Sequence, residues 1–293
     1  MVPELSDSPP TQNALLQNRA RAALAGLRNC TFCGLRCGVD RLAGRPAACL
    51  LGAETWCFKT YVSYAEDLDL VPALRVYLAG CSFRCRFCNT APDCLAPRIG
   101  RKVEPAVLAV EWLEWLGAGG RSIHLLGGEP SLHVHTILQL AAAAGRPLPL
   151  VLDTNAYMSY QVLELLTDVV SVYVADFKFG NDRCAERLAR VCGYVEQVTG
   201  SLLRMAMQSN VRVRHLLLPG HVECCFRPVV DWLSRHLPGV RFRLLTSYVP
   251  EWRAASDPVI GRLNGRAEVA AALEHLAASN LDWSTDIDGW REA

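Results

Sequence analysis

The sequence has no long hydrophobic run and almost no net charge, and each absence excludes a class of protein. No apolar stretch approaches the roughly 18 residues that span a bilayer, and the N-terminal region lacks the apolar segment of a signal peptide. We therefore expect a cytosolic protein that does not act at a membrane. The formal net charge is +1, so no basic surface for binding nucleic acid is expected either.

Cysteine, in contrast, is abundant. The chain of 293 residues contains 13 cysteines, while its 51% hydrophobic and 20% charged residues are usual for a folded globular protein. The cytosol keeps thiols reduced, and a chain of this length does not need disulfides to fold. Cysteines that cluster in the sequence therefore indicate bound metal.

The pattern of apolar residues changes along the chain. Helical spacing from Ala14 to Leu27 precedes a cysteine-rich segment with little periodicity, and short apolar runs alternate with helical stretches from Ala73 to about Pro250. The pattern predicts four parts: an N-terminal extension and helix (1–29), a cysteine-rich metal-binding segment (30–72), a main α/β domain (73–250) and a C-terminal helical extension (251–293).

About six strand–helix units fit between Ala73 and Pro250, which predicts a parallel sheet covered by helices. Most of the predicted strands end in glycine or polar residues, as in the sequences GCSFRC, GGEP, DTN and DFK. The carboxyl ends of parallel strands form one rim, where ligands bind in such folds. We therefore expect the chemistry at one rim of a barrel-like domain.

The sequence CSFRCRFC places Cys81, Cys85 and Cys88 within eight residues without an obvious fourth ligand. Three thiolates bound to a [4Fe–4S] cubane leave one iron without a protein ligand. A structural zinc site usually has four protein ligands. The spacing therefore favours an iron–sulfur cluster over zinc.

CSFRCRFC followed by LLGGEP resembles the radical S-adenosylmethionine (SAM) superfamily, whose signature CxxxCxΦC has an aromatic residue at Φ, here Phe87. In order, NCTFCGLRCGVDRLAGRPAAC, CSFRC, GGEPSLH, DTNAY, DFKFG and RHLLLPG resemble pyruvate formate-lyase activating enzyme-like proteins that carry an N-terminal cysteine block. The resemblance extends from about Cys30 to Pro250. It implies a partial (β/α)6 barrel, a [4Fe–4S] cluster and SAM as cofactors.

The resemblance also implies roles for individual residues. Cys81, Cys85 and Cys88 match the cluster ligands, and the free iron of this family binds the amino and carboxylate groups of SAM. Carboxylates suit the positive groups of SAM, and a cation suits its carboxylate. The residues that match SAM contacts of the family are Gly127, Gly128, Glu129, Asp153, Asn155, Asp176 and Lys178.

Two positions in this resemblance allow another interpretation. His215 lies in an apolar strand, so it is either a hydrogen-bonded core residue or a contact to SAM or substrate. Tyr248, in LLTSYVPEW, stands in the neighbourhood where activases of pyruvate formate-lyase have a histidine. That SAM contact is therefore not expected here.

A second cysteine group precedes the barrel. Its members, Cys30, Cys33, Cys37 and Cys49, suit a structural Zn²⁺ site or a second iron–sulfur cluster equally well by number. Structural metal is slightly favoured, because the thiols could fold this segment without a role in electron transfer. Cys57 lies nearby in sequence and could replace one of these ligands. Cys94, Cys184, Cys192, Cys224 and Cys225 are interpreted as packed thiols.

The resemblance implies reductive cleavage of SAM to methionine and a 5′-deoxyadenosyl radical that abstracts a hydrogen atom, without a protein general base. An electron donor such as flavodoxin or ferredoxin would supply the electron. The favoured substrate is a glycine Cα of a glycyl-radical enzyme; the alternative is a small molecule or peptide in a biosynthetic pathway. A third hypothesis, from another class, is a zinc-binding interaction module.

Overall fold

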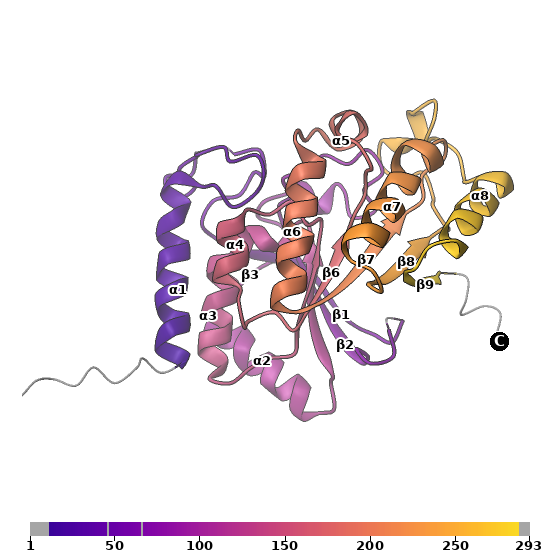
Figure 1. Cartoon of the computed structure of the whole chain (residues 1–293). Helices are drawn as coiled ribbons and strands as arrows, with labels where there is room; N and C mark the ends of the chain where they lie inside the picture. The colour runs from indigo at the N-terminus through magenta and orange to yellow at the C-terminus, as the bar shows by residue number, and fades with distance from the viewer. Residues whose placement is uncertain (1–11, 46, 66, 287–293) are drawn as a thin grey trace, which may run out of the picture.

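The computed structural model describes residues 12–45, 47–65 and 67–286 (Figure 1). In this part of the chain, nine strands form one sheet in the order β3-β1-β2-β4-β5-β6-β7-β8-β9. The strands are β1 (Trp56–Ser63), β2 (Ala73–Leu78), β3 (Arg101–Lys102), β4 (Ser122–Gly127), β5 (Leu150–Thr154), β6 (Val172–Asp176), β7 (Asn210–Leu216), β8 (Arg241–Leu245) and β9 (Asp282–Thr285).

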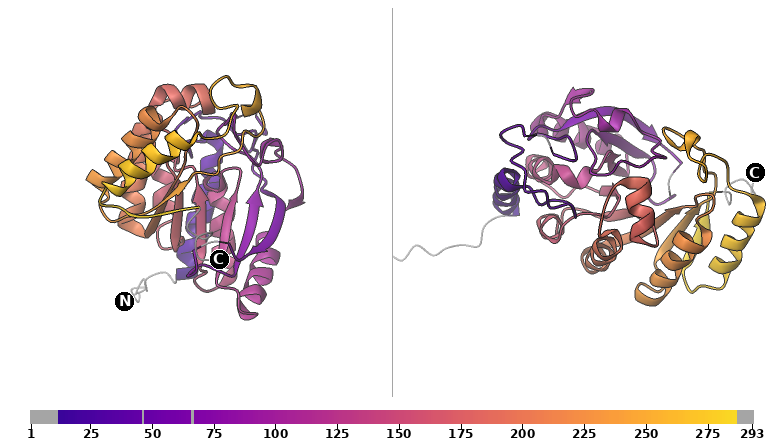
Figure 2. Two further views of the ribbon diagram at one scale, coloured as in Figure 1. Left: turned by 90° about the vertical axis from the view of Figure 1, so that its right-hand side faces the viewer. Right: turned by 90° about the horizontal axis from the view of Figure 1, so that it is seen from above.

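From β2 to β9 all neighbouring strands are parallel. The connections between them contain α2 (Pro105–Gly117), α3 (Val134–Ala144), α4 (Tyr160–Leu165), α5 (Asp182–Ala189), α6 (Tyr194–Gln208), α7 (Arg227–His236) and α8 (Arg266–Ala277). The sheet curves and its helices lie on the outer face, so the strands enclose an open barrel (Figure 2). The predicted α/β fold, a partial barrel with a cysteine-rich N-terminal segment, is confirmed.

Two additions extend this barrel. The strand β1 pairs antiparallel with β2 and carries β3 at the sheet edge, although the sequence pattern predicted no strand before Ala73. At the other edge, β9 adds a parallel strand to β8. Its sequence DWST is short and largely exposed, which explains why the apolar pattern did not reveal it.

Helix α1 (Gln12–Gly26) precedes the barrel and packs along α3 (Figure 1). Its Ala20 and Ala23 are buried, as the predicted helical spacing requires. No helix in the described ranges combines the length and apolar character needed to cross a membrane.

The loop between β1 and β2 covers the barrel interior at the amino ends of the strands. Leu70 packs with Val151, Val172 and Val174 of β5 and β6. On the same loop, Asp69 accepts a hydrogen bond of 3.1 Å from Nη1 of Arg212 in β7. The interior therefore presents its ligand-accessible side chains at the opposite, carboxyl ends of the strands.

Candidate functional site

A cavity of about 390 Å³ lies at the carboxyl ends of the parallel strands. Residues that follow β2, β4, β5 and β6 meet there, as the sequence predicted for the rim. The predicted site residues that line it are Cys81, Cys85, Cys88, Gly127, Gly128, Asp153, Asn155, Asp176 and Lys178.

The loop that carries the three cysteines is anchored by aromatic packing and by backbone hydrogen bonds. The ring of Phe83 lies 5.3 Å from that of Tyr157 and 6.0 Å from that of Tyr194. The backbone amides of Arg84 and Arg86 each donate 2.8 Å hydrogen bonds to carbonyls at the end of α5. These contacts fix the loop so that its three thiols face the cavity.

The environments of the three thiols differ. Burial raises the pKa of Cys85 to about 12, and the ammonium group of Lys178 opposes this effect. A hydrogen bond from Cys94 is the main cause that lowers the pKa of Cys88 to about 5. The Sγ atoms of Cys88 and Cys94 are 3.6 Å apart. Because the thiolates of a cubane bind different irons, this short separation suits Cys94 as a hydrogen-bond donor to Cys88 rather than as a fourth ligand.

The turn after β4 lies directly against the cysteine loop. The amides of Gly128 and Glu129 donate 2.8 Å hydrogen bonds to the carbonyls of Leu78 and Gly80. A Cβ atom on Gly128 would lie 2.0 Å from the Gly80 oxygen, and Gly127 has a φ of +107°. Both glycines are therefore required for the turn to pack this closely.

The Glu129 side chain is buried outside the cavity lining. Its carboxylate accepts hydrogen bonds from the Thr154 hydroxyl at 2.7 Å and from the Asn155 amide at 2.8 Å. Burial raises its pKa, while these hydrogen bonds and one from Ser131 oppose the rise. In this arrangement Glu129 joins the turn after β4 to the end of β5, and its side chain is not open to a ligand.

A chain of alternating charges crosses the cavity at the ends of β5, β6 and β7. Arg214 Nη1 lies 3.1 Å from Asp153 Oδ1, and Arg214 Nε lies 3.0 Å from Asp176 Oδ1. Lys178 Nζ then donates to Asp176 Oδ2 at 2.7 Å. The cavity therefore offers both carboxylates and cations to a ligand.

Electrostatic attraction within this chain outweighs burial. Burial alone would raise the pKa of Asp176, but Arg214 and Lys178 hold it at about 2. For Asp153, Arg214 and His124 likewise lower the pKa against the effect of burial. The pKa of Lys178 is raised by Asp176 although burial opposes this. All three groups are therefore charged at neutral pH.

Three of the residues that build this charge chain were not predicted from the sequence as site residues. Arg214, Arg75 and His124 all contact Asp153, at 3.1, 3.9 and 3.0 Å respectively. A signal for Arg214 was available, because arginine and valine alternate in VRVRH and one face of a strand carries every second residue. His124 had no such signal, because it stands within an apolar run.

Three further predicted positions have distinct surroundings. Asn155 lines the cavity, and its side-chain oxygen accepts a hydrogen bond from the Tyr157 amide at 2.9 Å. His215 is buried outside the cavity lining, with Nδ1 2.7 Å from the Phe177 carbonyl, which matches the core interpretation. Tyr248 lines the cavity, while its hydroxyl donates to the Ile260 carbonyl at 2.7 Å.

The N-terminal cysteine quartet (Cys30, Cys33, Cys37 and Cys49) lies outside the cavity lining. The Cys37 thiol lies 3.9 Å from the Cys30 carbonyl. Burial raises the pKa of Cys33 to about 12, and the charges of Cys49, Cys30 and Cys37 add to the rise. Their segment docks on the loop after β5, where the Gly34 amide donates to the Tyr157 carbonyl at 3.0 Å. The structure thus groups the quartet near the barrel rim.

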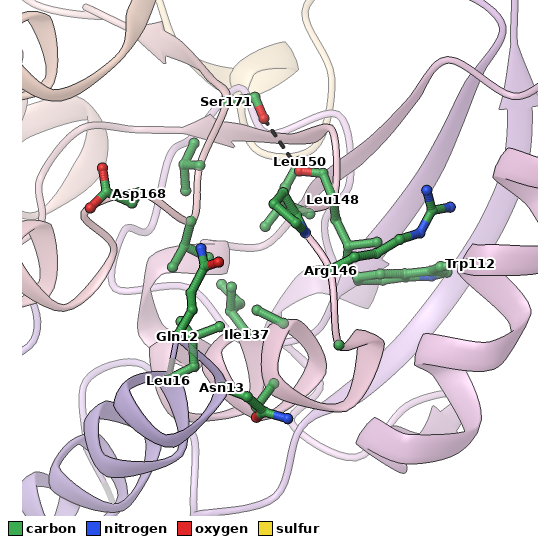
Figure 3. Close-up of a pocket in the computed structure, with 16 residues that line it drawn as sticks. Gln12, Asn13, Leu16, Trp112, Ile137, Arg146, Leu148, Leu150, Asp168 and Ser171 are labelled. Atoms are coloured by element: carbon green, nitrogen blue, oxygen red, sulfur yellow. Dashed lines mark hydrogen bonds between the residues drawn. The ribbon is translucent and has the colours of Figure 1, made fainter. Parts of the chain in front are cut away.

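A second cavity of about 280 Å³ lies near the amino end of β5, beside α1 and α3 (Figure 3). Trp112, Ile137, Leu148 and Leu150 contribute its apolar lining. It contains no cysteine and lies at the strand end away from the predicted ligand rim. We therefore assign no chemistry to it.

The sequence model of the radical SAM superfamily matches residues 76–233. The chain belongs to the radical SAM superfamily. This membership implies an enzyme of radical chemistry that uses a [4Fe–4S] cluster and SAM. The donor set fits these cofactors, because three partly buried thiols and a chain of charges share one cavity.

Individual proteins are similar to this chain in sequence or in fold. The uncharacterized protein MJ0674 of Methanocaldococcus jannaschii is 30% identical over 274 residues, which cover 92% of this chain and 80% of the relative. Streptococcus suis SuiB bound to its precursor peptide SuiA is similar in structure, with a TM-score of 0.54 and 17% identity over 72% of this chain.

SuiB bound to S-adenosylmethionine has a TM-score of 0.52 and 19% identity over 70% of this chain. Each of these two comparisons covers 48% of SuiB, so this radical SAM chain matches about half of that longer protein. At such identities the likeness concerns the fold. The substrate of SuiB is therefore not assigned to this chain.

Proposed function

We propose that this radical SAM protein binds its [4Fe–4S] cluster through Cys81, Cys85 and Cys88 and binds SAM in the adjoining cavity. The observation that supports this is the shared cavity of three thiols and a chain of carboxylates and cations. The chemistry supplied by the bound cluster is one-electron reduction of SAM, which yields methionine and a 5′-deoxyadenosyl radical.

The residues of the cavity would orient SAM. Asp153 and Asp176 offer carboxylates to its positive groups, and Lys178 offers a cation to its carboxylate. The two glycines let the turn after β4 pack against the cysteine loop, and both glycines line the cavity. None of these side chains needs to exchange a proton, because the bond cleavage is homolytic.

For the substrate we propose a polypeptide, whose glycine Cα loses a hydrogen atom as in the activation of a glycyl-radical enzyme. The loop after β8 supports a polypeptide, because Val249 lines the cavity and is 56% exposed. Trp252, on the same loop, is 38% exposed. Exposed apolar side chains at a cavity mouth suit contact with another chain.

The proposed setting is the cytoplasm, with a flavodoxin or ferredoxin as electron donor. The N-terminal quartet would bind a structural metal that folds its segment onto the loop after β5. Four cysteines within the short segment from Cys30 to Cys49 support a metal site, and zinc and a second iron–sulfur cluster are the two forms to distinguish.

The test is anaerobic incubation of the iron-loaded protein with SAM and dithionite, with and without a glycyl-radical enzyme from a neighbouring gene. We expect a glycine-centred radical in the partner by EPR, formed together with 5′-deoxyadenosine. If a metabolite and no polypeptide couples SAM cleavage to product formation, the small-molecule alternative is correct. A colourless protein that takes up zinc and no iron would instead support the interaction module.

A further inference from the structure

A separate group of thiols lies outside the cavity, between α5 and the short helix η4 (Val222–Phe226) that leads into α7. Cys184 is in the first turn of α5, and Cys224 and Cys225 are in η4. The Sγ atoms of Cys184 and Cys224 are 3.8 Å apart, and those of Cys224 and Cys225 are 3.9 Å apart. These cysteines, interpreted from sequence as packed thiols, are thus brought together by the fold.

A histidine completes the group. One ring nitrogen of His221 and the sulfurs of Cys184 and Cys224 all lie within 4.8 Å of one another. We propose that Cys184, His221 and Cys224 bind one Zn²⁺ ion, whose fourth position would be filled by a water molecule. Tetrahedral Zn²⁺ with Zn–S bonds of about 2.3 Å would separate its sulfurs by about 3.8 Å.

The same spacing argues against an iron–sulfur cubane at this position. In a cubane each thiolate binds a different iron, which places the sulfurs further apart than around a single ion. The distance of 3.8 Å between the sulfurs of Cys184 and Cys224 is that of a mononuclear site. Cysteine and histidine together are the ligands typical of structural zinc.

The orientation of His221 suits metal binding. Its Nδ1 lies 2.7 Å from the Pro219 carbonyl, so Nδ1–H donates there and Nε2 keeps its lone pair. Arg187 Nη2 lies 2.9 Å from Nε2 and would have to move, while its Nη1 already contacts Asp257 at 3.3 Å.

Asn181 supports both ligand segments from one position. Its side-chain oxygen accepts a hydrogen bond from the Cys184 amide at 2.8 Å, and its Nδ2 donates to the Cys224 carbonyl at 2.5 Å. The same Nδ2 lies 3.9 Å from Cys225 Sγ. Hydrogen bonds around the ligands of a metal site orient them in this way.

The proposed ion would have a structural role near the radical site. The end of α5 accepts backbone hydrogen bonds from the cysteine loop, where the Arg84 amide donates to Ala189 and the Arg86 amide to Leu188, both at 2.8 Å. A zinc ion that joins α5 to η4 would therefore stabilise the position of α5, which anchors that loop. Cys224 is exposed, so the ion can enter from solvent.

The first test counts metals in the iron-loaded, anaerobically purified protein after equilibration with zinc sulfate and removal of free metal. We expect Cys184→Ser and Cys224→Ser each to lower zinc by about one ion per chain without changing iron. Cys192→Ser, which alters an exposed cysteine outside the group, is the matched control and should change neither metal. Equal zinc in wild type and Cys224→Ser would overturn the proposal.

A second test needs no variant and therefore does not depend on the folding of the substituted chains. In the zinc-equilibrated wild type, Cys224 should resist alkylation by N-ethylmaleimide until a chelator removes zinc, while exposed Cys192 reacts in both states. Equal labelling of Cys224 with and without chelator would contradict the site. So would a Cys184–Cys224 disulfide found by peptide mapping without reductant.

Discussion

The strand β5 contributes to two cavities of opposite character. At its amino end Leu150 lines the cavity beside α1 and α3, whereas at its carboxyl end Asp153 and Thr154 line the cavity of the three thiols. The first has a largely apolar lining without cysteine, and the second combines thiols with a chain of partly buried charges. One strand therefore serves packing at one end and chemistry at the other.

The difference follows from the parallel fold. Loops after the carboxyl ends of adjacent strands converge, so side chains distant in sequence meet at that rim. Cys85, Asp153 and Lys178 come from loops or strand ends after β2, β5 and β6, yet all line one cavity. A substitution at this rim should change SAM binding or SAM cleavage. A substitution at the opposite end should change only the free energy of unfolding.

The largest effect is expected from Cys85→Ala at the rim. Removal of one of three thiolates should abolish reductive SAM cleavage because the cluster loses a ligand, while the fold is retained. The measurement is 5′-deoxyadenosine released after dithionite reduction, with circular dichroism to confirm folding. Cys192→Ser is the control. Wild-type release by Cys85→Ala would show that the assignment of the three ligands is wrong.

Arg214→Met should affect both SAM binding and stability. The substitution leaves Asp153 and Asp176 without the cation that contacts both, at 3.1 and 3.0 Å. Breaking a mostly buried ion pair of this kind costs about 3 kcal/mol of unfolding free energy.

Denaturant unfolding and SAM titration of iron-loaded Arg214→Met would measure these two effects. Arg214→Lys, which keeps the charge, is the matched variant and should recover part of both losses. Unchanged stability and SAM affinity in Arg214→Met would indicate that the charge chain has no role.

The N-terminal quartet allows a third comparison, because its thiols lie near the rim but line neither cavity. Cys30→Ser/Cys33→Ser should remove the metal of that segment and leave most of the SAM cleavage by the other site. Metal analysis distinguishes the two forms of the site: loss of zinc at constant iron means structural zinc, and loss of iron means a second cluster. A complete loss of SAM cleavage in a folded variant would contradict the separation of the two sites.

The smallest effect on SAM cleavage is expected in the cavity near the amino end of β5. Leu148→Ala should lower the free energy of unfolding by about 2–4 kcal/mol, since a buried leucine side chain is removed. SAM cleavage per folded molecule should equal that of the wild type. Denaturant unfolding and the 5′-deoxyadenosine assay together check this, and a marked loss of cleavage would indicate that the two ends are coupled.

Much of the barrel could be predicted because its strands are short apolar runs with glycine or polar ends. The predicted alternation of strands and helices after Ala73 is present in the structure, for example in α2 and α3. The strands β1 and β9 were missed because they are edge strands with many exposed positions, which weakens the apolar pattern.

Local motifs indicated the three cysteines and the two glycines, since the members of each set lie within a few residues of one another in the sequence. Partners that depend on tertiary structure were not visible. Cys94 comes within 3.6 Å of Cys88 through the turn that follows the motif. Cys184 and Cys224 are 40 residues apart, and only the packing of α5 against η4 brings their sulfurs to 3.8 Å.

In the proposed site, the three thiols leave one iron of the cluster open to SAM within the cavity. The most direct measurement is electron–nuclear double resonance of the reduced, iron-loaded protein with SAM that carries ¹⁵N in its amino group. We expect a hyperfine coupling between the cluster and this nitrogen, absent in Cys85→Ala. A reduced cluster in the wild type that shows no coupling at saturating SAM would contradict the account.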